Sequence, residues 1–397
     1  MLELERTIEI DPFVERARSL WREASGRATS VRLELFAKAA VRVRATRDLD
    51  RTGVTIDRAL ESGLAVRVLR AGHDHAGFAA ASGLTGDVLR WVVDTASTFN
   101  ARASASAPGP SESIEAERWD LDAAVALPGE ETLTRGIITR PNLEWVEAGT
   151  TIEVLIGGEG WLAARRRHRL WALGAGHDAK LVAQRGFADW EQLLDGLGDD
   201  LSFPAPAGVS DLGVFVFTPD AATSIVAALV DEFHGPESPR LTEIGHGWEV
   251  IDEPGRPEGL AGGSFDDAGF PAASRQLAAS GTWLGNLSGP GTFRRASFRE
   301  PPSEMATTLV VPSGEEALLP ARAAVARRCR VMRASHALWV LEVDLVNRLS
   351  PGGLQRRWVR VHPQTLIAAC ASRLGRARVT PTGPIVPGLL FEGLLSS

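Results

Sequence analysis

The segment from residue 264 to residue 287 constrains the fold of this chain most, because its turn residues stand at fixed places between apolar runs. Asp266 and Asp267 carry short carboxylates that can close a local turn, and Gly269 tolerates a positive φ. Pro271 cannot donate a ladder hydrogen bond to a neighbouring strand. The segment is therefore predicted to form one strand–turn–strand unit, with Asp266, Asp267 and Gly269 as its structural turn.

The two aspartates also suggest an acid–base pair. However, adjacent residues of a strand point to opposite faces, and the Ala268 and Gly269 that follow offer no nucleophile. Turn capping is therefore the interpretation that we prefer for Asp266 and Asp267.

The chain is long enough for more than one domain. Its 397 residues exceed what a single core usually serves. Residues 101–111 and 200–210 are small, polar and interrupted by prolines, as linkers are. We expect an N-terminal α+β domain over residues 1–105, a strand-rich middle region over 112–200 and a β-rich C-terminal domain over 211–397.

The predicted fold class is α+β, because strands dominate and no βαβ periodicity is present. Helices are expected after Asp11 and from the capping Thr85 to about residue 99. Alternating residues predict strands over 31–37 and 41–45, and a hairpin of 64–69 with 77–81. The C-terminal domain is expected to hold one prominent helix, from 220 to 233. Its apolar residues recur at helical spacing and should be buried against the sheet: Ala222, Ile225, Val226, Leu229 and Val230.

Composition favours a soluble, cytoplasmic protein. The net charge of −7 argues against a large phosphate-binding surface. No run of about 18 apolar residues occurs, and the first residues lack the order of a signal peptide. Cys329 and Cys370 are too few for a disulfide framework, so we expect buried, reduced thiols.

Three charged clusters invite functional interpretations. The two histidines of residues 73–75 could share a metal on a strand, although a glycine-bounded tip is more often solvated. The basic run 165–169 lies between two tryptophans, as in some single-strand nucleic-acid sites, but a polar strand face with partly buried stems is the simpler interpretation. Glu232 and His234 cannot easily share one ion on a helix, because residues two apart point in different directions.

Five segments, taken in order, resemble one known family. Residues 61–79 with the helix after Thr85, then 248–254, 264–287, 293–302 with 308–314, and 387–394 are similar to signature segments of the TldD/TldE (PmbA) family. Residues 100–200 match poorly, and Thr308 stands where the family usually has Asn. These proteins were once called modulators of DNA gyrase and are regarded as subunits of a metalloprotease.

The sequence departs from the catalytic half of that family at the zinc motif. In the TldD type, one helix carries His-Glu-x-x-x-His, in which two histidines ligate zinc and the glutamate handles protons of the bound water. Aligned on Gly235, the motif positions hold Ala227, Ala228 and Glu232. The family's third ligand, a cysteine, would fall near Leu374 or Gly375. The resemblance therefore implies that this chain has lost its zinc site and carries no metal or other cofactor.

The function that the resemblance implies is that of a non-catalytic, TldE-like subunit. Such a subunit pairs with a zinc-bearing, TldD-like paralogue, or with itself, and forms part of a cleft for unfolded peptides. Arg294, Arg295 and Arg299 are candidates for binding a peptide carboxylate or carbonyl, although plain surface exposure is as good an interpretation. Two alternatives stay open: a homodimeric peptide-binding or regulatory protein without protease function, and an enzyme with another chemistry in the same cleft.

Overall fold

The computed structural model shows two sheet-based halves that meet along a polar junction. It describes these parts of the chain: residues 9–27, 32–48, 53–69, 76–98, 117–122, 127–141, 143–157, 160–174, 181–185, 211–233, 243–256, 258–260, 262–285, 287–295, 297–315, 323–335, 337–346, 354–380 and 384–394.

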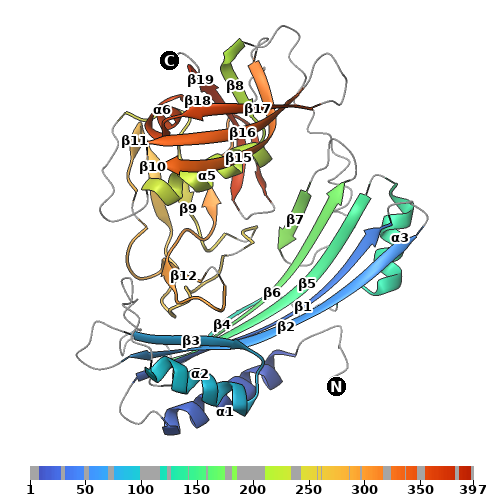
Figure 1. Cartoon of the computed structure of the whole chain (residues 1–397), viewed down its shortest axis with the longest axis vertical. Helices are drawn as coiled ribbons and strands as arrows, with labels where there is room; N and C mark the ends of the chain where they lie inside the picture. The colour runs from blue at the N-terminus through green and yellow to red at the C-terminus, as the bar shows by residue number, and fades with distance from the viewer. Residues whose placement is uncertain are drawn as a thin grey trace.

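The N-terminal half is a seven-stranded sheet with the order β3-β2-β1-β5-β6-β4, in which β7 also pairs with β6. Only β4 runs parallel to its neighbour. Figure 1 shows β1, β2, β5 and β6 as long curved strands. The strand bounds are β1 Arg32–Arg47, β2 Val54–Leu69, β3 Ala76–Ser82, β4 Glu117–Leu121, β5 Leu143–Ile156, β6 Leu162–Gly174 and β7 Leu181–Arg185.

Three helices cover one face of this sheet. α1 (Ile10–Arg27) and α2 (Gly86–Thr98) lie at one end, and α3 (Glu130–Thr139) lies at the other (Figure 1). Leu20 of α1 and Leu89 of α2 are buried in one core, and Leu133 of α3 is buried in a second. The opposite face of the sheet is thereby left for the C-terminal half.

The C-terminal half is built on a ten-stranded mixed sheet with the order β11-β10-β9-β14-β19-β8-β15-β16-β17, in which β18 also pairs with β19. β12 and β13 form a separate two-stranded ribbon. The bounds are β8 Asp211–Phe217, β9 Val250–Asp252, β10 Arg275–Ala279, β11 Thr282–Trp283, β12 Phe293–Arg294, β13 Ser303–Glu304, β14 Leu309–Val310, β15 Ala323–Ser335, β16 Leu338–Val346, β17 Leu354–Val361, β18 Cys370–Val379 and β19 Ile385–Glu392.

One long helix, α5 (Pro219–Phe233), packs against β15 and β19 of this sheet, and the short α6 (Pro363–Ala368) leads into β18. The five apolar residues predicted to be buried on α5 are all buried, among them Leu229 at 0% exposure. Around them three aromatic rings stack edge to face, with Trp248 about 6 Å from both Trp283 and Phe391. The predicted helix and its packing are confirmed.

Several sequence-based expectations are also confirmed. The class is α+β, α2 begins after Thr85, and the Thr85 hydroxyl accepts a hydrogen bond from the Val88 amide at 3.3 Å. Cys370 is a fully buried free thiol, as expected, whereas Cys329 is a free thiol that is only half-buried, so the expected burial holds for one of the two. None of the helices in the described ranges is long and apolar enough to cross a membrane.

Other expectations need correction. The strands predicted over 31–37 and 41–45 are one continuous strand, β1, because residues 38–40 continue the extended backbone without a turn. The division of the first half into residues 1–105 and 112–200 stays a prediction, although the strands of both regions share one sheet. Residues 264–287 form two successive turns, since Phe265 bridges Pro271 and β10 then pairs with β11 around Ser280 and Gly281.

Candidate functional site

The densest group of buried charges lies where loops of the C-terminal half meet the bare face of the N-terminal sheet. We call it the junction cluster and define it as Asp120, Glu153, Arg165, Arg167, Asp267 and Arg295. Four of these residues come from strands β4, β5 and β6, and the last two come from the loop after Phe265 and the end of β12. Charged groups that lose water need partners, so the contacts within the cluster define the geometry of the junction.

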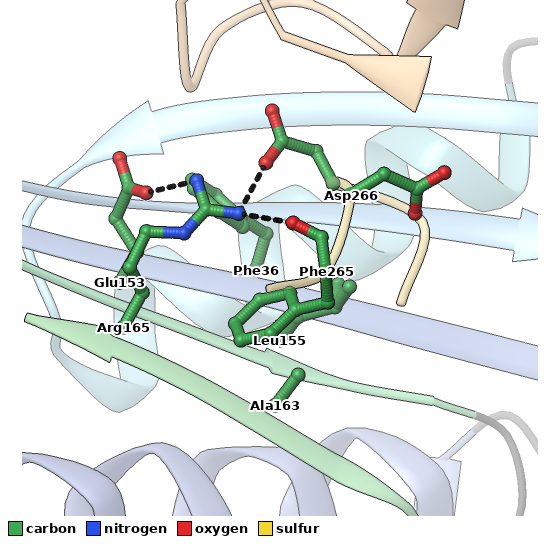
Figure 2. A pocket seen from close by; sticks show the side chains of 8 residues that line it. Phe36, Glu153, Leu155, Ala163, Arg165, Phe265 and Asp266 are labelled. Atoms are coloured by element: carbon green, nitrogen blue, oxygen red, sulfur yellow. Dashed lines mark hydrogen bonds and ion pairs between the residues drawn. The ribbon is translucent and has the colours of Figure 1, made fainter. Parts of the chain in front are cut away.

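Arg165 of β6 is the centre of the junction cluster. Its guanidinium donates to Glu153 Oε2 at 3.2 Å, to the Phe265 carbonyl at 2.9 Å and to Asp267 Oδ1 at 3.3 Å. It also lies over the Phe265 ring, 4.8 Å from the ring centroid. Figure 2 shows the side chain reaching from the sheet to the C-terminal loop. Arg165 therefore joins the two halves through one buried side chain.

A second arginine of the same strand repeats this arrangement. Arg167 is 2% exposed, pairs with the Asp120 carboxylate, and donates to the Gly262 carbonyl at 3.2 Å. Asp120 Oδ2 also accepts a hydrogen bond from the Ser264 amide at 2.6 Å. Side chains two apart on a strand share a face, so Arg165 and Arg167 both point at the loop that begins near Gly262.

The loop that receives them is shaped by Asp266. Its Oδ1 accepts from the amides of Ala268 and Phe270, and its Oδ2 accepts from the amide of Gly291 at 2.8 Å. Gly269 has a φ of 88°, and a Cβ there would lie 2.4 Å from the Trp161 ring. Asp266 thus joins two loops through backbone hydrogen bonds, and only glycine fits at position 269.

The three candidate peptide-binding arginines have different settings. Arg294 is 6% exposed and donates to Thr307 Oγ1 at 2.5 Å. Arg295 donates its amide to Asp267 Oδ2 at 2.7 Å, and its guanidinium lies over the Phe36 ring at 4.9 Å. Arg299 is exposed and donates to Ser82 Oγ at 3.2 Å. Arg299 is therefore the most accessible of the three, Arg295 is half-buried and Arg294 is buried.

Burial and neighbouring charge shift the pKa values of this region in opposite directions. Burial alone would raise the pKa of Asp267, but the Arg165 and Arg294 charges and the Arg295 amide outweigh it and lower that pKa. The pKa of Asp120 is lowered in the same way by Arg167. Burial raises the pKa of Asp266 above its usual value. Burial also lowers the pKa of Arg295 to about 10, although the negative charge of Asp267 acts to raise it.

The junction leaves only a small pocket. It is lined by the residues of Figure 2, including Arg165, Phe36 and Phe265, and it has room for about one water molecule. A peptide side chain does not fit there. The junction is therefore a structural contact between the two halves, and a peptide would have to bind on a surface beside it.

The positions that the family resemblance aligns with the zinc motif lie elsewhere, on α5. Ala228 is buried in the apolar core, while Ala227 and Glu232 are partly exposed. Beside them, the Arg333 guanidinium of β15 donates to the Ala228 carbonyl at 2.9 Å and to Asp231 Oδ2 at 3.3 Å. Two methyl groups and a neighbouring cation do not fit a Zn²⁺ site, which needs His, Cys or carboxylate ligands around the ion.

The expected position of the third ligand offers no donor either. Leu374 is buried in β18, and Gly375 has a φ of 70°. In the described ranges, no three His, Cys, Asp or Glu side chains are grouped so that they could hold a metal ion. The pair His73 and His75, and also His234, lie outside the described residues.

Sequence reasoning missed the role of the basic run 165–169. It predicted side chains with partly buried stems and solvated ends, but Arg165 and Arg167 are buried to their guanidinium groups. His168 is also buried, with its Nδ1 2.8 Å from Thr150 Oγ1. The carboxylate partners of Arg165 and Arg167 are Asp267 and Asp120, which lie far away in the chain. The basic run itself therefore contains no local sign that its arginines are buried. Since these charges are paired within the chain, the nucleic-acid interpretation loses the groups on which it depended.

The sequence matches no protein-family model and no curated protein. Solved structures, in contrast, share the whole fold. TldE from Thermococcus kodakarensis has a TM-score of 0.68 at 12% identity, covering 95% of this chain and 98% of the other. A putative modulator of DNA gyrase from Bacteroides thetaiotaomicron has a TM-score of 0.64 at 12% identity, with coverages of 97% and 99%. Another, from Thermotoga maritima, has a TM-score of 0.61 at 12% identity, with coverages of 96% and 99%.

These comparisons define the fold class of the chain: it is a two-part α+β protein with the architecture of TldE. The chain has the fold of TldE and of the putative modulators of DNA gyrase over nearly its full length. The fold implied by the five sequence segments is therefore confirmed.

Proposed function

We propose that this chain is a non-catalytic, TldE-like subunit of a TldD/TldE-type zinc metalloprotease that acts on unfolded peptides. One observation carries the proposal: a chain with the fold of TldE has alanine at positions 227 and 228 of α5, where the catalytic type carries a ligand and its neighbouring glutamate. Alanine provides neither a ligand for zinc nor a group that could accept a proton from water.

In this proposal the chain contributes binding surface and the zinc-bearing partner contributes the chemistry. Strand addition suits an unfolded substrate, because backbone hydrogen bonds hold a peptide without strong dependence on its sequence. Arg299 is the candidate for contact with a peptide carboxylate, since its side chain is exposed beside Ser82. Arg294 and Arg295 act as positioning residues, because their guanidinium groups are engaged with Thr307 and with the Phe36 ring.

The proposal also requires a stable dimer. A subunit without its own zinc takes part in proteolysis only if its surface completes the partner's cleft. The interface with a TldD-like partner, or with a second copy, should bury more than about 1,000 Å² of total surface. Light scattering of the chain with and without the partner measures this association.

The direct test is reconstitution with a TldD-like chain that carries an intact His-Glu-x-x-x-His motif. Hydrolysis of a fluorescent unstructured peptide should need both chains, and a chelator should abolish it through the partner. Arg299→Glu should raise KM with little change in kcat, whereas Arg22→Glu, on the exposed side of α1, should change neither. Cleavage by the isolated chain in the presence of chelator would favour an enzyme of another chemistry. Peptide binding without any effect of a partner would favour the homodimeric binding protein.

A further inference from the structure

The outer edge of the C-terminal sheet is a basic surface in an acidic protein. Strands β15, β16 and β17 carry seven arginines and two carboxylates between them, whereas the whole chain has a net charge of −7. The two carboxylates, Glu342 and Asp344, are both paired with Arg356. Arg328, Arg330, Arg357 and Arg360 are exposed and make no ion pair with the described residues. Positive charge is therefore concentrated on one end of one sheet.

Apolar side chains interrupt this charge. Trp358, in the middle of β17, is 59% exposed, and Leu338 of β16 is 39% exposed. Trp358 lies opposite Glu342, which lies opposite Arg330, so the tryptophan shares a face with Arg330 and, two residues away on its own strand, with Arg356 and Arg360. The other face of these strands packs on the α5 side through Trp339, Leu341 and Val359. The exposed tryptophan is thus on the solvent side of the sheet.

β17 also has a free edge among the described strands. It is the last strand of its sheet and pairs there only with β16 (Figure 1). A free edge presents backbone N–H and C=O groups that an added strand can use. Charged residues on an edge commonly prevent pairing between like strands, and that function would explain the arginines but not the exposed tryptophan.

Charge decides which occupant the edge can accept. If two copies paired antiparallel through β17 about Trp358, Arg356 of each copy would face Arg360 of the other. Like charges that face each other across strands are destabilising, so a second copy is a poor occupant. An added strand whose every second residue reads acidic, apolar, acidic would instead place its carboxylates opposite Arg356 and Arg360 and its apolar side chain opposite Trp358.

We propose that the β17 edge, defined as Arg356, Trp358 and Arg360 with the neighbouring Arg330, is a docking site for an acidic, extended segment of a partner protein, which adds to the sheet as a strand. The edge lies on the outer strands of the C-terminal sheet and includes none of the residues of the degenerate zinc motif or the junction cluster. Charge sets the choice of partner, and the backbone ladder with the Trp358 contact holds it.

The test uses a fluorescein-labelled peptide of the repeat Glu-Thr-Val-Thr, in which glutamate and valine alternate along one face of a strand, with fluorescence anisotropy as the readout. The full chain should bind it, and the affinity should fall as salt rises. Arg330→Glu with Arg360→Glu should weaken binding by at least about tenfold. The control, Arg22→Glu with Arg135→Glu on α1 and α3, makes the same change in net charge and should leave binding unchanged. Thermal melting establishes that both double variants fold.

Two further probes separate strand addition from plain charge attraction. The same peptide with every backbone amide N-methylated keeps its charge but donates no ladder hydrogen bond, so it should bind at least about tenfold more weakly. The peptide with lysine in place of each glutamate should not bind. The proposal is overturned if the acidic peptide fails to bind at about 1 mM, if N-methylation has no effect, or if a single-stranded oligothymidylate binds more tightly than the acidic peptide at the same edge.

Discussion

The junction cluster and the α5 core are both buried, but they are held together by different forces. The α5 core is apolar: Leu229, Ile225 and Val226 are fully buried among aromatic rings, and its stability comes from removing hydrocarbon from water. The junction cluster buries arginines and aspartates that must satisfy one another. The comparison teaches that α5 serves as apolar packing, while buried charge is used to join the two halves.

The largest effect should come from breaking the junction cluster. Arg165→Met removes the cation that neutralises Asp267 and Glu153, and an uncompensated buried charge typically costs about 3–5 kcal/mol. Urea denaturation measures this loss. Arg90→Met, which removes the arginine of an exposed pair with Asp87 on α2, is the matched control and should leave the midpoint nearly unchanged.

Adding Asp267→Asn to Arg165→Met sharpens the same comparison. The double variant should lose less stability than the sum of the two single variants, because the second change removes a charge that the first left unpaired. Strict additivity of the two losses would mean that Arg165 and Asp267 do not interact as the geometry indicates.

The α5 core should respond nearly as strongly to loss of volume. Leu229→Ala leaves a cavity in an apolar core and should cost about 2–5 kcal/mol. The control is Leu338→Ala, the same substitution at a residue that is 39% exposed, which should cost much less. Equal midpoint shifts for the two variants would show that α5 is not packed as described.

A smaller effect tests the close approach at the junction turn. Gly269 and Gly281 both have positive φ, so alanine strains the backbone at either position. At position 269 the added methyl group would also collide with Trp161, whereas at 281 it would meet no atom within 4 Å. Gly269→Ala should therefore lower the melting temperature clearly more than Gly281→Ala. Similar decreases in melting temperature for the two variants would mean that Trp161 does not contact the turn at Gly269.

The smallest effect is a difference in pH dependence between two pairs of carboxylates. The folded-state pKa values of Asp120 and Asp267 are lowered, so they stabilise the fold above about pH 3.9, the ordinary value, and this contribution is lost as the pH falls below it. Burial raises the pKa values of Asp252 and Asp266, so their contribution is present below that value and is lost as the pH rises through their folded pKa values.

Urea midpoints measured from pH 3 to pH 7.5 separate these contributions. Asp252→Asn should reduce the loss of stability on going from about pH 4 toward neutral pH, and Asp267→Asn should reduce the loss below about pH 4. Midpoint curves for both variants that run parallel to the wild-type curve would contradict the directions of these pKa shifts.

The sequence predicted what depends on local pattern. The periodicity of residues 222–230 predicted α5 and its buried face, and Thr85 predicted the start of α2. The turn residues Asp266 and Gly269 marked a tight turn, although the sequence did not indicate that Asp266 also binds the amide of Gly291. That contact joins residues 25 positions apart and depends on how two loops pack.

The junction cluster could not be predicted for the same reason. Arg165 and Asp267 are separated by about a hundred residues, and a lone sequence contains no sign that a charge in one sheet will meet a charge in another loop. The sequence left Arg294 and Arg295 as candidates either for peptide binding or for plain surface exposure, yet in three dimensions Arg294 donates to Thr307 and Arg295 lies over the Phe36 ring. Local pattern predicted the elements, and the packing of distant segments determined the polar contacts between them.

The most direct test of the central proposal is the zinc content of the purified chain. Elemental analysis after dialysis should find well below about 0.1 zinc per chain, because Ala227, Ala228 and Leu374 provide no ligands for a tetrahedral site. Ala227→His with Ala228→Glu and Glu232→His, which restores the motif side chains, provides the comparison in the same protein. One tightly bound zinc per wild-type chain would contradict the proposal that this subunit is non-catalytic.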